Sequence, residues 1–483
     1  MKKRPIWMGC LLIAMICSVI LFRRADAMRF QGLQVKSEEQ LRQLTENLSE
    51  ISGLQDMGEL IELDGKTIPY DRFHNTFYVS QSTKVAEYAG TFHVIGEQYS
   101  VYLQEDGKLK DKQTAIYDGH VFRLWFVAKE EYAVADLVFT GLPVISIDIA
   151  ENGLAENYGK GEIVVQNPDD DDVITMSIKD SAVWIKTNYH SGTISFKLCK
   201  QDYQEERNLN LLGLGKHTSW KLYPVHDRDD SAFREMLAAY VWNCVCEDEK
   251  LHRNMEYAEV IVDGQYCGLY YLAPKLGKGF LDLEEDDRLY KAEGDIYSVV
   301  GDEDIGKNRR ALEEYLSLWD DDNREYEQIN TGNYADYHIW LQTVCGIQSS
   351  KEDYCVIAHE NSGTYEFCRV PERSKFVFGI YPSEMGWRSL TAAESIMEDE
   401  PYERLAEGAG STIEEEFLKK WHDLRNGALS TEVMWQYAGL YEEKLIESGY
   451  IARNANQEEY KAACLDVRQF IERRLSYLDD CYD

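Results

Sequence analysis

Three segments contain residue types that could bind a metal ion or a phosphate group, but none has the spacing that such a site needs. The acidic run at 169–172 lacks the alternating oxygen ligands and the closing glutamate of a calcium loop. The Gly-Leu-Gly-Lys segment at 213–216 lacks the G-x-x-x-x-G-K-[ST] pattern of a phosphate-binding loop. The Cys-Val-Cys segment at 244–246 is too short for the C-x₂₋₄-C half-site of zinc. We therefore interpret the first two segments as turns, and we expect no metal site made of histidine and cysteine.

The charge balance and the composition exclude several classes of protein. The chain of 483 residues carries 51 basic and 86 acidic side chains, a net charge of −35. Such a surplus repels polyanions, so we expect no nucleic-acid partner. With 44% hydrophobic and 12% aromatic residues, the chain is too apolar to be disordered. At about 150 residues per domain, the length predicts two or three folded units.

The first 27 residues have the organisation of a secretory signal. Basic residues at 2–4 precede an uncharged run at 5–22, and an Ala-Asp-Ala triplet at 25–27 follows. The two arginines before this triplet are less usual near a cleavage site, so an uncleaved membrane anchor is the alternative. In either case we expect the rest of the chain to lie outside the cytoplasm. That remainder carries −39, because the first 27 residues hold five basic residues and one acidic residue.

From residue 28 to about 180 the pattern predicts mainly β-structure. Short β-branched and aromatic runs are punctuated by Gly and Asp at regular spacing, as in an antiparallel sandwich or barrel. One helix is expected over 37–48, opened by Ser37. The expected strands are 76–82, 91–96, 99–104, 120–128 and 142–149.

Beyond about residue 181 helices become frequent. Asp230 or Ser231 is placed to cap a helix whose apolar residues recur at three- and four-residue steps. An Asp-Gly pair at 263–264 predicts the type I′ turn of a β-hairpin. A second hairpin is expected to turn at 361–363. The other expected elements are strands at 353–358, 364–370 and 375–382 and helices at 334–346 and 457–480.

Four segments in order along the chain resemble the spore-coat protein H (CotH) family. They are 208–242, 258–274, 421–430 and 470–480. The resemblance implies an α+β fold, in which an N-terminal β-rich domain is followed by an atypical kinase-like bilobe with a β-rich N-lobe and a helical C-lobe. We therefore divide the chain into a signal peptide or signal anchor (1–27), an N-terminal β-rich domain (28–141) and a CotH kinase-like domain (142–480).

The resemblance also implies ATP-dependent phosphorylation of protein serines, with Mg²⁺ or Mn²⁺ as the cofactor. Such a centre needs positive groups on the phosphates, carboxylates that hold the metal and a carboxylate near the acceptor hydroxyl. Lys186 and Lys197 are loose candidates for binding the nucleotide. Lys221 is a third candidate, although a solvated strand position is the simpler interpretation for it.

The family's catalytic and metal-binding positions are largely substituted in this chain. The catalytic Asp falls on Gln348 or Ser349, depending on the alignment, and the metal-binding Asn falls on Asp353. The family's P-W-D-[ML]-D segment is matched by YPSEMGW at 381–387, where Glu384 takes the first Asp position and a glycine takes the second. Asp353 and Glu384 are therefore the candidate metal ligands, because both offer hard carboxylate oxygens. The alternative is that both carboxylates face water.

We expect an exported CotH-like protein with a kinase fold and impaired catalysis, acting in spore-coat or cell-surface assembly. One alternative is an active, divergent protein serine kinase that uses ATP and Mg²⁺. Another is a non-enzymatic surface adhesion or scaffold protein. The expected partners are Ser-rich or Lys-rich coat or surface proteins, and the membrane is contacted only through an uncleaved N-terminal segment. The expected location is extracytoplasmic, either anchored or secreted, at the spore surface if the coat role applies.

Overall fold

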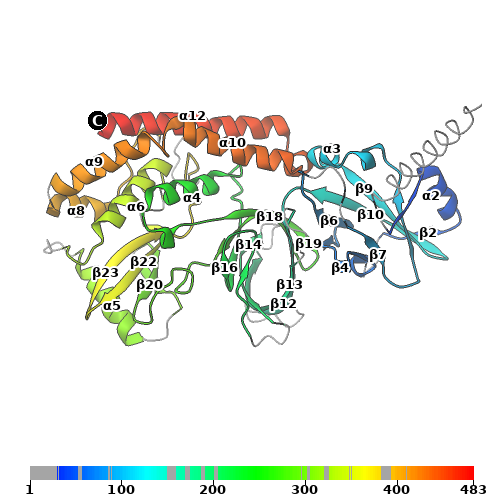
Figure 1. Cartoon of the computed structure of the whole chain (residues 1–483), viewed down its shortest axis with the longest axis horizontal. Helices are drawn as coiled ribbons and strands as arrows, with labels where there is room; N and C mark the ends of the chain where they lie inside the picture. The colour runs from blue at the N-terminus through cyan, green and yellow to red at the C-terminus, as the bar shows by residue number, and fades with distance from the viewer. Residues whose placement is uncertain are drawn as a thin grey trace, which may run out of the picture.

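The computed structural model (Figure 1) describes residues 30, 32–52, 57–84, 88, 90–149, 159–168, 174–185, 191–200, 205–294, 296–301, 305–319, 326–347, 349, 351–381, 393–409 and 411–482. The fold is mixed α+β, with a β-rich N-terminal part and a helical C-terminal part. The segment 1–27, the acidic run at 169–172 and the candidates Lys186, Gln348 and Glu384 lie outside the described residues. Within the ranges above, no helix combines the length and apolarity needed to cross a lipid bilayer.

A mixed β-sheet forms the N-terminal part. In order across the sheet its strands are β1 (Gln34–Lys36), β8 (Ser100–Gln104), β9 (Val121–Val127), β10 (Glu131–Thr140), β6 (Thr76–Ser80) and β5 (Tyr70–Asp71), with β2 (Ser49–Glu50) also pairing β10. We expected antiparallel pairing, and this was wrong for β1 with β8, β2 with β10 and β6 with β10, which are parallel. Parallel neighbours need a long crossover, and the chain between β6 and β10 supplies one that includes α3 (Lys112–Tyr117).

Smaller elements complete this part. A side sheet contains β4 (Lys66–Thr67), β3 (Ile61–Leu63) and β7 (Phe92–Val94). The predicted first helix is α2 (Glu38–Thr45). Its N-cap is Ser37 as expected, whose hydroxyl accepts from the N–H of Gln40 while the Gln40 side chain accepts from the N–H of Ser37. This reciprocal pair satisfies two backbone donors that the first turn leaves open.

A closed barrel follows. Around it run β11 (Val144–Ile149), β12 (Gly159–Gln166), β13 (Ile174–Ile185), β14 (Ser191–Cys199), β17 (Ser219–Pro224), β19 (Gln265–Pro274) and β18 (Glu256–Val262), and β18 pairs β11 to close it. A short ladder of β15 (Leu209–Asn210) and β16 (Lys216–His217) lies between β14 and β17 in the chain. The hairpin turn between β18 and β19 is confirmed: Asp263 and Gly264 have φ of +48° and +71°, as a type I′ turn requires.

The helix α4 (Arg234–Val245) follows the barrel strand β17. We expected Asp230 or Ser231 to cap it, and this was wrong. Oδ2 of Asp229 accepts the hydrogen bond from the N–H of Arg234 at 3.0 Å, while Oδ1 accepts from the Ser231 hydroxyl at 2.5 Å. The N-cap position itself is Phe233, which makes no side-chain cap hydrogen bond.

A second sheet lies on the far side of the barrel from the N-terminal part (Figure 1). Its strands are, in order, β21 (Ile296–Val299), β20 (Arg288–Glu293), β22 (Glu352–Asn361) and β23 (Thr364–Pro371). We call this the C-terminal sheet. The β22–β23 hairpin is confirmed, with Ser362 and Gly363 at φ of +54° and +95° in its turn. The strand expected at 375–382 was wrong for residues 375–381, because the Phe378 N–H donates to the Val344 carbonyl at 2.8 Å instead of joining the sheet.

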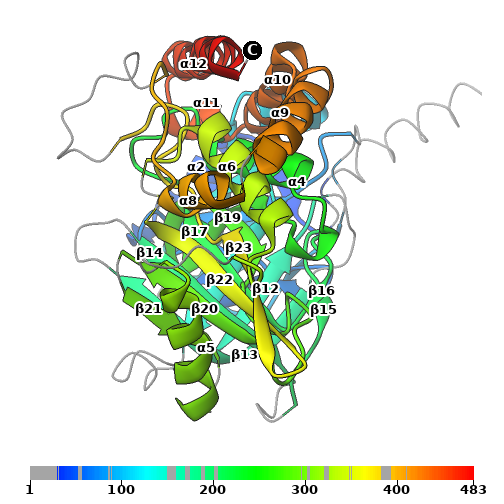
Figure 2. The ribbon, with the colours of Figure 1, turned by 90° about the vertical axis from the view of Figure 1, so that its left-hand side faces the viewer.

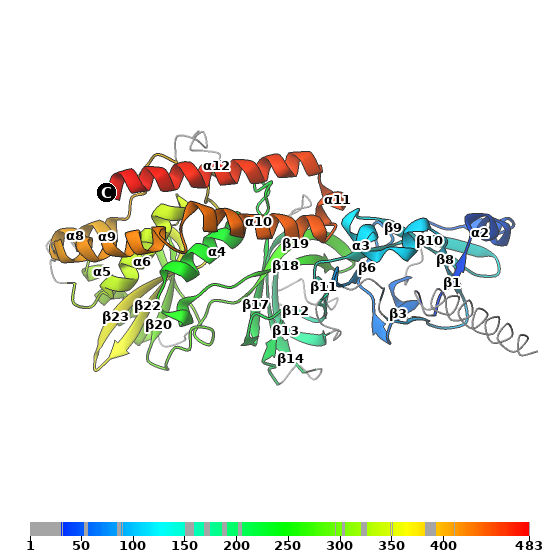
Figure 3. The same ribbon diagram turned by 45° about the horizontal axis from the view of Figure 1, so that its top comes forward.

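Helices cover one side of the C-terminal sheet (Figure 2). They are α6 (Thr331–Val344), α8 (Glu400–Ala409) and α9 (Ser411–Arg425), whereas α5 (Ile305–Ser317) lies beside the strands. Above them α10 (Thr431–Glu447) and α12 (Gln457–Tyr482) run along the C-terminal sheet and the barrel (Figure 3). The predicted apolar stripe of α12 is confirmed, because all of its members are buried: Tyr460, Cys464, Val467, Ile471, Leu475 and Leu478.

The corner between α10 and α12 reaches the N-terminal part. Here the short helix α11 (Tyr450–Asn454) lies beside α3 (Figure 3). Gly449 has φ of +74°, and a Cβ on it would lie 1.8 Å from the carbonyl oxygen of Ile116. Only glycine permits this approach. The predicted boundary at 141–142 falls between β10 and β11, and the division into domains stays a prediction.

Candidate functional site

A buried cluster of charged side chains lies between the barrel and the C-terminal sheet. Lys221 projects from the outer face of β17, because its neighbours Trp220 and Leu222 belong to the barrel core. Its Nζ donates to Oε1 of Glu372 at 2.6 Å, and Nζ of Lys291 in β20 lies 3.2 Å from Oε2. The side chains of Lys221 and Glu372 are only 17% and 8% exposed. The interpretation of Lys221 as a solvated strand position was therefore wrong.

Glu372 is the electrostatic centre of this cluster. Burial alone would raise the pKa of its carboxyl, but the charges and hydrogen bonds of Lys221 and Lys291 lower that pKa to about 2. Burial alone would likewise lower the pKa of Lys221, whereas Tyr223 and Glu372 raise it. A buried charge is tolerated when it is paired and hydrogen-bonded in this way. Both lysines are thus paired with the same carboxylate of the protein itself.

A second ion pair lies beside the first and ties the end of β23 to α4. Nε and Nη2 of Arg373 donate to Oε2 and Oε1 of Glu235 at 3.0 and 3.1 Å. This bidentate geometry matches a planar guanidinium to a carboxylate. Nη2 also donates to the carbonyl oxygen of Pro224 at 2.7 Å. We refer to Lys221, Lys291, Glu372, Arg373 and Glu235 together as the Glu372 cluster.

Asp353, one of the two candidate metal ligands, lies next to the Glu372 cluster at the start of β22. Its carbonyl oxygen accepts hydrogen bonds from the N–H groups of Glu372 and Arg373 at 2.8 and 3.3 Å. Burial raises the pKa of its carboxyl to about 6, and the charge of Lys375 offsets part of that effect. A metal ligand must be deprotonated. Asp353 is therefore a weaker ligand near neutral pH than an ordinary aspartate.

The other described candidates lie outside the cluster. Lys197 in β14 shares the outer face of the barrel with Lys221, but it pairs with Glu206. Ser349 is 3% exposed, and its carbonyl oxygen accepts a hydrogen bond from the Tyr337 hydroxyl at 2.6 Å. Neither contact places these side chains at a shared centre with Asp353.

The fit of a divalent cation to this region is poor. Among the described residues, no group of three or more His, Cys, Asp or Glu side chains has a geometry that could hold a metal ion. The charges around Asp353 are mixed. The cations of Lys375 and Arg373 repel Mg²⁺ or Mn²⁺, and the carboxylates of Glu372 and Glu352 attract it.

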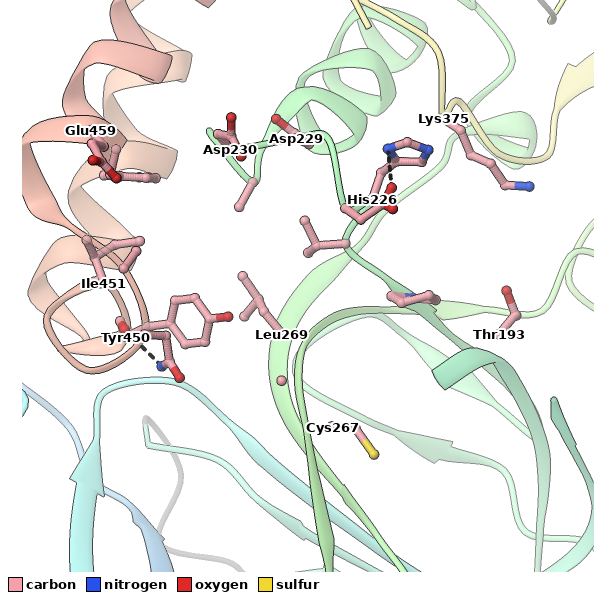
Figure 4. A pocket seen from close by; sticks show the side chains of 18 of the residues that line it. Thr193, His226, Asp229, Asp230, Cys267, Leu269, Lys375, Tyr450, Ile451 and Glu459 are labelled. Carbon is pink, nitrogen blue, oxygen red and sulfur yellow. Dashed lines mark hydrogen bonds and ion pairs between the residues drawn. The ribbon is translucent and has the colours of Figure 1, made fainter. Parts of the chain in front are cut away.

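A cavity of about 1280 Å³ opens beside the Glu372 cluster, between one end of the barrel and the helices α11 and α12. Figure 4 shows Lys375 and His226 toward one side of it and Asp230 and Glu459 toward the other. Arg373 also lines this cavity. The basic side of the cavity therefore continues into the Glu372 cluster. The acidic side of the cavity is formed by α12 and the turn before α4.

Sequence reasoning missed most members of the Glu372 cluster. One signal could have pointed to Glu372 and Arg373: two charged residues directly follow a strand that ends at Pro371. Glu235 and Lys291 gave no such signal, because charged residues are common in helices and strands. Their importance depends on partners that are distant in the chain.

Comparison with known proteins gives one match. A family model described as CotH kinase protein matches residues 190–351. The matched region includes Lys221, Glu235 and Lys291, and it ends before Glu372 and Arg373. No curated protein matches the chain.

Proposed function

Since the chain belongs to the CotH family through residues 190–351, we propose that it is an exported, kinase-like protein whose catalytic centre is impaired. It acts by binding other proteins during assembly of a spore coat or cell surface. The observation that carries this proposal is the pairing of Lys221 with Glu372. Glu372 forms an ion pair with a lysine that a nucleotide-binding centre would use to bind phosphate.

The order of charged residues is comparable with that in protein kinases, but their pairing differs. In kinases a strand lysine pairs with a glutamate of the αC helix, and the lysine serves the nucleotide phosphates. Here Lys221 lies in β17 and Glu235 lies in the next helix, α4. Lys221 instead binds Glu372, and Glu235 binds Arg373. A triphosphate would have to displace a buried carboxylate to reach Lys221, which favours weak or absent nucleotide binding.

The end of β23 offers a second placement for the family's P-W-D-[ML]-D segment. Residues 371–375 are Pro-Glu-Arg-Ser-Lys, so the two carboxylate positions would hold Arg373 and Lys375. This segment directly follows the second hairpin. Under this placement, cationic side chains stand where the family holds its metal ion.

The position near the acceptor hydroxyl is also without a carboxylate. Whichever alignment applies, it holds Gln348 or Ser349, and neither side chain accepts a proton as a carboxylate does. The active-kinase alternative depends on Asp353 and Glu384 as metal ligands, and the raised pKa of Asp353 leaves that carboxyl partly protonated near pH 6. Impaired catalysis accounts for these substitutions together.

The proposed partners are Lys-rich or Ser-rich coat or surface proteins. A net charge of −35 attracts basic segments at long range.

Export follows from the signal-like segment 1–27, and the anchored and secreted forms differ in whether that segment is cleaved. The adhesion alternative assigns function to the N-terminal part. That part packs closely on the barrel, where the ring of Tyr78 stacks on Tyr266 at 4.9 Å, and this favours a supporting role for it.

The proposal is tested by incubating the chain with labelled ATP, Mg²⁺ or Mn²⁺ and Ser-rich or Lys-rich coat proteins. We expect no phosphate transfer above the protein-free control, together with binding of the coat proteins that weakens as salt is raised. Metal-dependent transfer that is lost in Asp353→Asn and kept in the exposed control Asp466→Asn would contradict impaired catalysis. It would support the active-kinase alternative.

A further inference from the structure

A second, much smaller cavity of about 20 Å³ lies against the Glu372 cluster. Tyr223 and Arg253 line it, together with the carboxylate residues Glu235 and Glu372. Both Tyr223 and Arg253 are buried, with exposed fractions of 3% and 5%. This cavity is separate from the large one shown in Figure 4, which neither Tyr223 nor Arg253 lines.

Two hydrogen-bond donors at this cavity have no partner in the part of the chain that the structure describes. They are the hydroxyl of Tyr223 and Nη1 of Arg253. Nearly all buried polar groups in proteins find a partner, either in the protein or in a bound species. Two such donors on residues that line one cavity favour the binding of an acceptor there.

The charge around the cavity shows which kind of acceptor is favoured. The guanidinium of Arg253 has no carboxylate partner among the described residues: its Nη2 reaches only the carbonyl oxygen of Glu372, at 3.5 Å. Its other neighbour is the ring of Phe280, 5.3 Å from its central carbon. A buried cation without a counter-charge is strongly unfavourable.

The carboxylates that line the cavity are already engaged. Glu235 accepts both hydrogen bonds from Arg373, and Glu372 is held by Lys221 and Lys291. Lys291 also lies 3.5 Å from a carboxylate oxygen of Glu293, so with Arg253 included four cationic side chains face three carboxylates. The region carries an excess of positive charge inside a strongly acidic protein.

We propose that this cavity binds one monatomic anion of the halide class, held by Nη1 of Arg253 and the hydroxyl of Tyr223. The volume suits a single small species, since one water needs roughly 10–15 Å³ of such space, and it excludes phosphate or sulfate. A water molecule would satisfy the two donors but would leave the guanidinium charge uncompensated. An anion satisfies both donors and also compensates the charge of the guanidinium. This inference does not depend on whether catalysis is impaired.

The test compares thermal unfolding of the full chain in sodium chloride, sodium bromide and sodium gluconate at equal ionic strength. A ligand that binds only the folded state raises the unfolding midpoint in a saturable way. We expect that rise with chloride and bromide and not with gluconate. Equal midpoints in halide and gluconate at every concentration would overturn the proposal. A crystal grown in bromide is expected to show an anomalous peak between Arg253 and Tyr223, and a water there without such a peak would also overturn it.

Two variants and a matched control locate the effect. Tyr223→Phe removes one donor with little change of volume and is expected to at least halve the halide-dependent shift. Arg253→Met removes the charge and is expected to abolish it. Tyr270→Phe is the control, because its hydroxyl is also buried without a partner in the described part of the chain but lies in the barrel core. A halide shift of native size in Tyr223→Phe would contradict the site, even if Arg253→Met fails to fold.

Discussion

Nζ of Lys221 donates a 2.6 Å hydrogen bond to Oε1 of Glu372, 151 residues further along the chain. The bond joins the barrel to the end of the C-terminal sheet. Because both side chains are buried, it contributes to the stability of the fold and to the state of the candidate site.

The pair is expected to be important for stability. Removing one partner of a buried ion pair leaves a charge without compensation and costs about 3–5 kcal/mol. Glu372→Gln leaves Lys221 without a carboxylate and should therefore lower the free energy of unfolding by about that amount in urea titrations. Lys221→Met should cost less, because Lys291 still pairs with Glu372. The exposed pair of Arg309 and Glu313 provides the control, since Arg309→Met should cost less than about 1 kcal/mol. Equal losses in Lys221→Met and Arg309→Met would show that the Lys221 bond does not stabilise the fold.

The contribution of Glu372 should depend on pH in the acid range. Its pKa is about 2 in the folded chain, below the ordinary value of 4.5. A lowered carboxyl pKa stabilises the fold fully above the unfolded value, and that stabilisation is lost as pH falls through the folded value. The difference in unfolding free energy between the native chain and Glu372→Gln should thus be constant above about pH 5 and shrink toward pH 2. A difference that does not change between pH 5 and pH 2 would argue against the ionised pair.

Asp353 should behave in the opposite way. Its folded pKa of about 6 lies above the ordinary value of 3.8, so the folded chain binds the proton more tightly than the unfolded chain. Stability from this group is present below about pH 4 and is lost as pH rises through 6. Asp353→Asn mimics the protonated form, and asparagine tolerates the φ of +64° at this position.

We therefore expect Asp353→Asn to be more stable than the native chain at pH 8, by about 1–3 kcal/mol. The two should become equal near pH 4, as measured by chemical denaturation across that range. Asp466→Asn, at an exposed position of α12, should show no such trend. If Asp353→Asn is less stable than the native chain at pH 8, its carboxylate makes a favourable contact that the structure does not show.

A buried polar junction is expected to hold the N-terminal part on the rest of the chain. Nη2 of Arg453 in α11 donates to Oε1 of Glu259 in β18 at 2.5 Å and to the hydroxyl of Thr140 in β10 at 3.2 Å. The side chains of Arg453 and Glu259 are 8% and 0% exposed. Since three elements meet there, Arg453→Met should loosen their packing and cost about 3–5 kcal/mol.

Hydrogen–deuterium exchange can follow this loosening. In Arg453→Met, faster exchange is expected in residues 28–141 and in α11, with little change in α12 beyond its first turns. Exchange that stays at native rates in both regions would show that the junction is not needed for docking. A deletion meant to remove only the N-terminal part should end at residue 141, because β11, β12 and β13 of the barrel lie between residues 144 and 185.

Local features of this chain could be predicted, and long-range ones could not. The stripe of α12 and the Asp263-Gly264 turn follow from periodicity and from backbone preference alone. The burial of Lys221 could not be predicted, because this residue alternates with the apolar Trp220 and Leu222 as a solvent-facing strand residue would. Its burial depends on Glu372, which arrives from the end of β23. The cap of α4 was also assigned to the wrong residues: its N-cap is Phe233, which makes no side-chain cap hydrogen bond, and Asp229 accepts from the N–H of Arg234.

The central claim is that Glu372 forms ion pairs with the lysines that a nucleotide would need to bind its phosphates. Isothermal titration of the full chain with Mn²⁺–ATP tests this claim most directly. We predict no binding heat for the native chain up to millimolar nucleotide. Saturable binding with a micromolar dissociation constant, weakened in Lys221→Met, would contradict the claim, because it would mean that the phosphates displace Glu372 from Lys221.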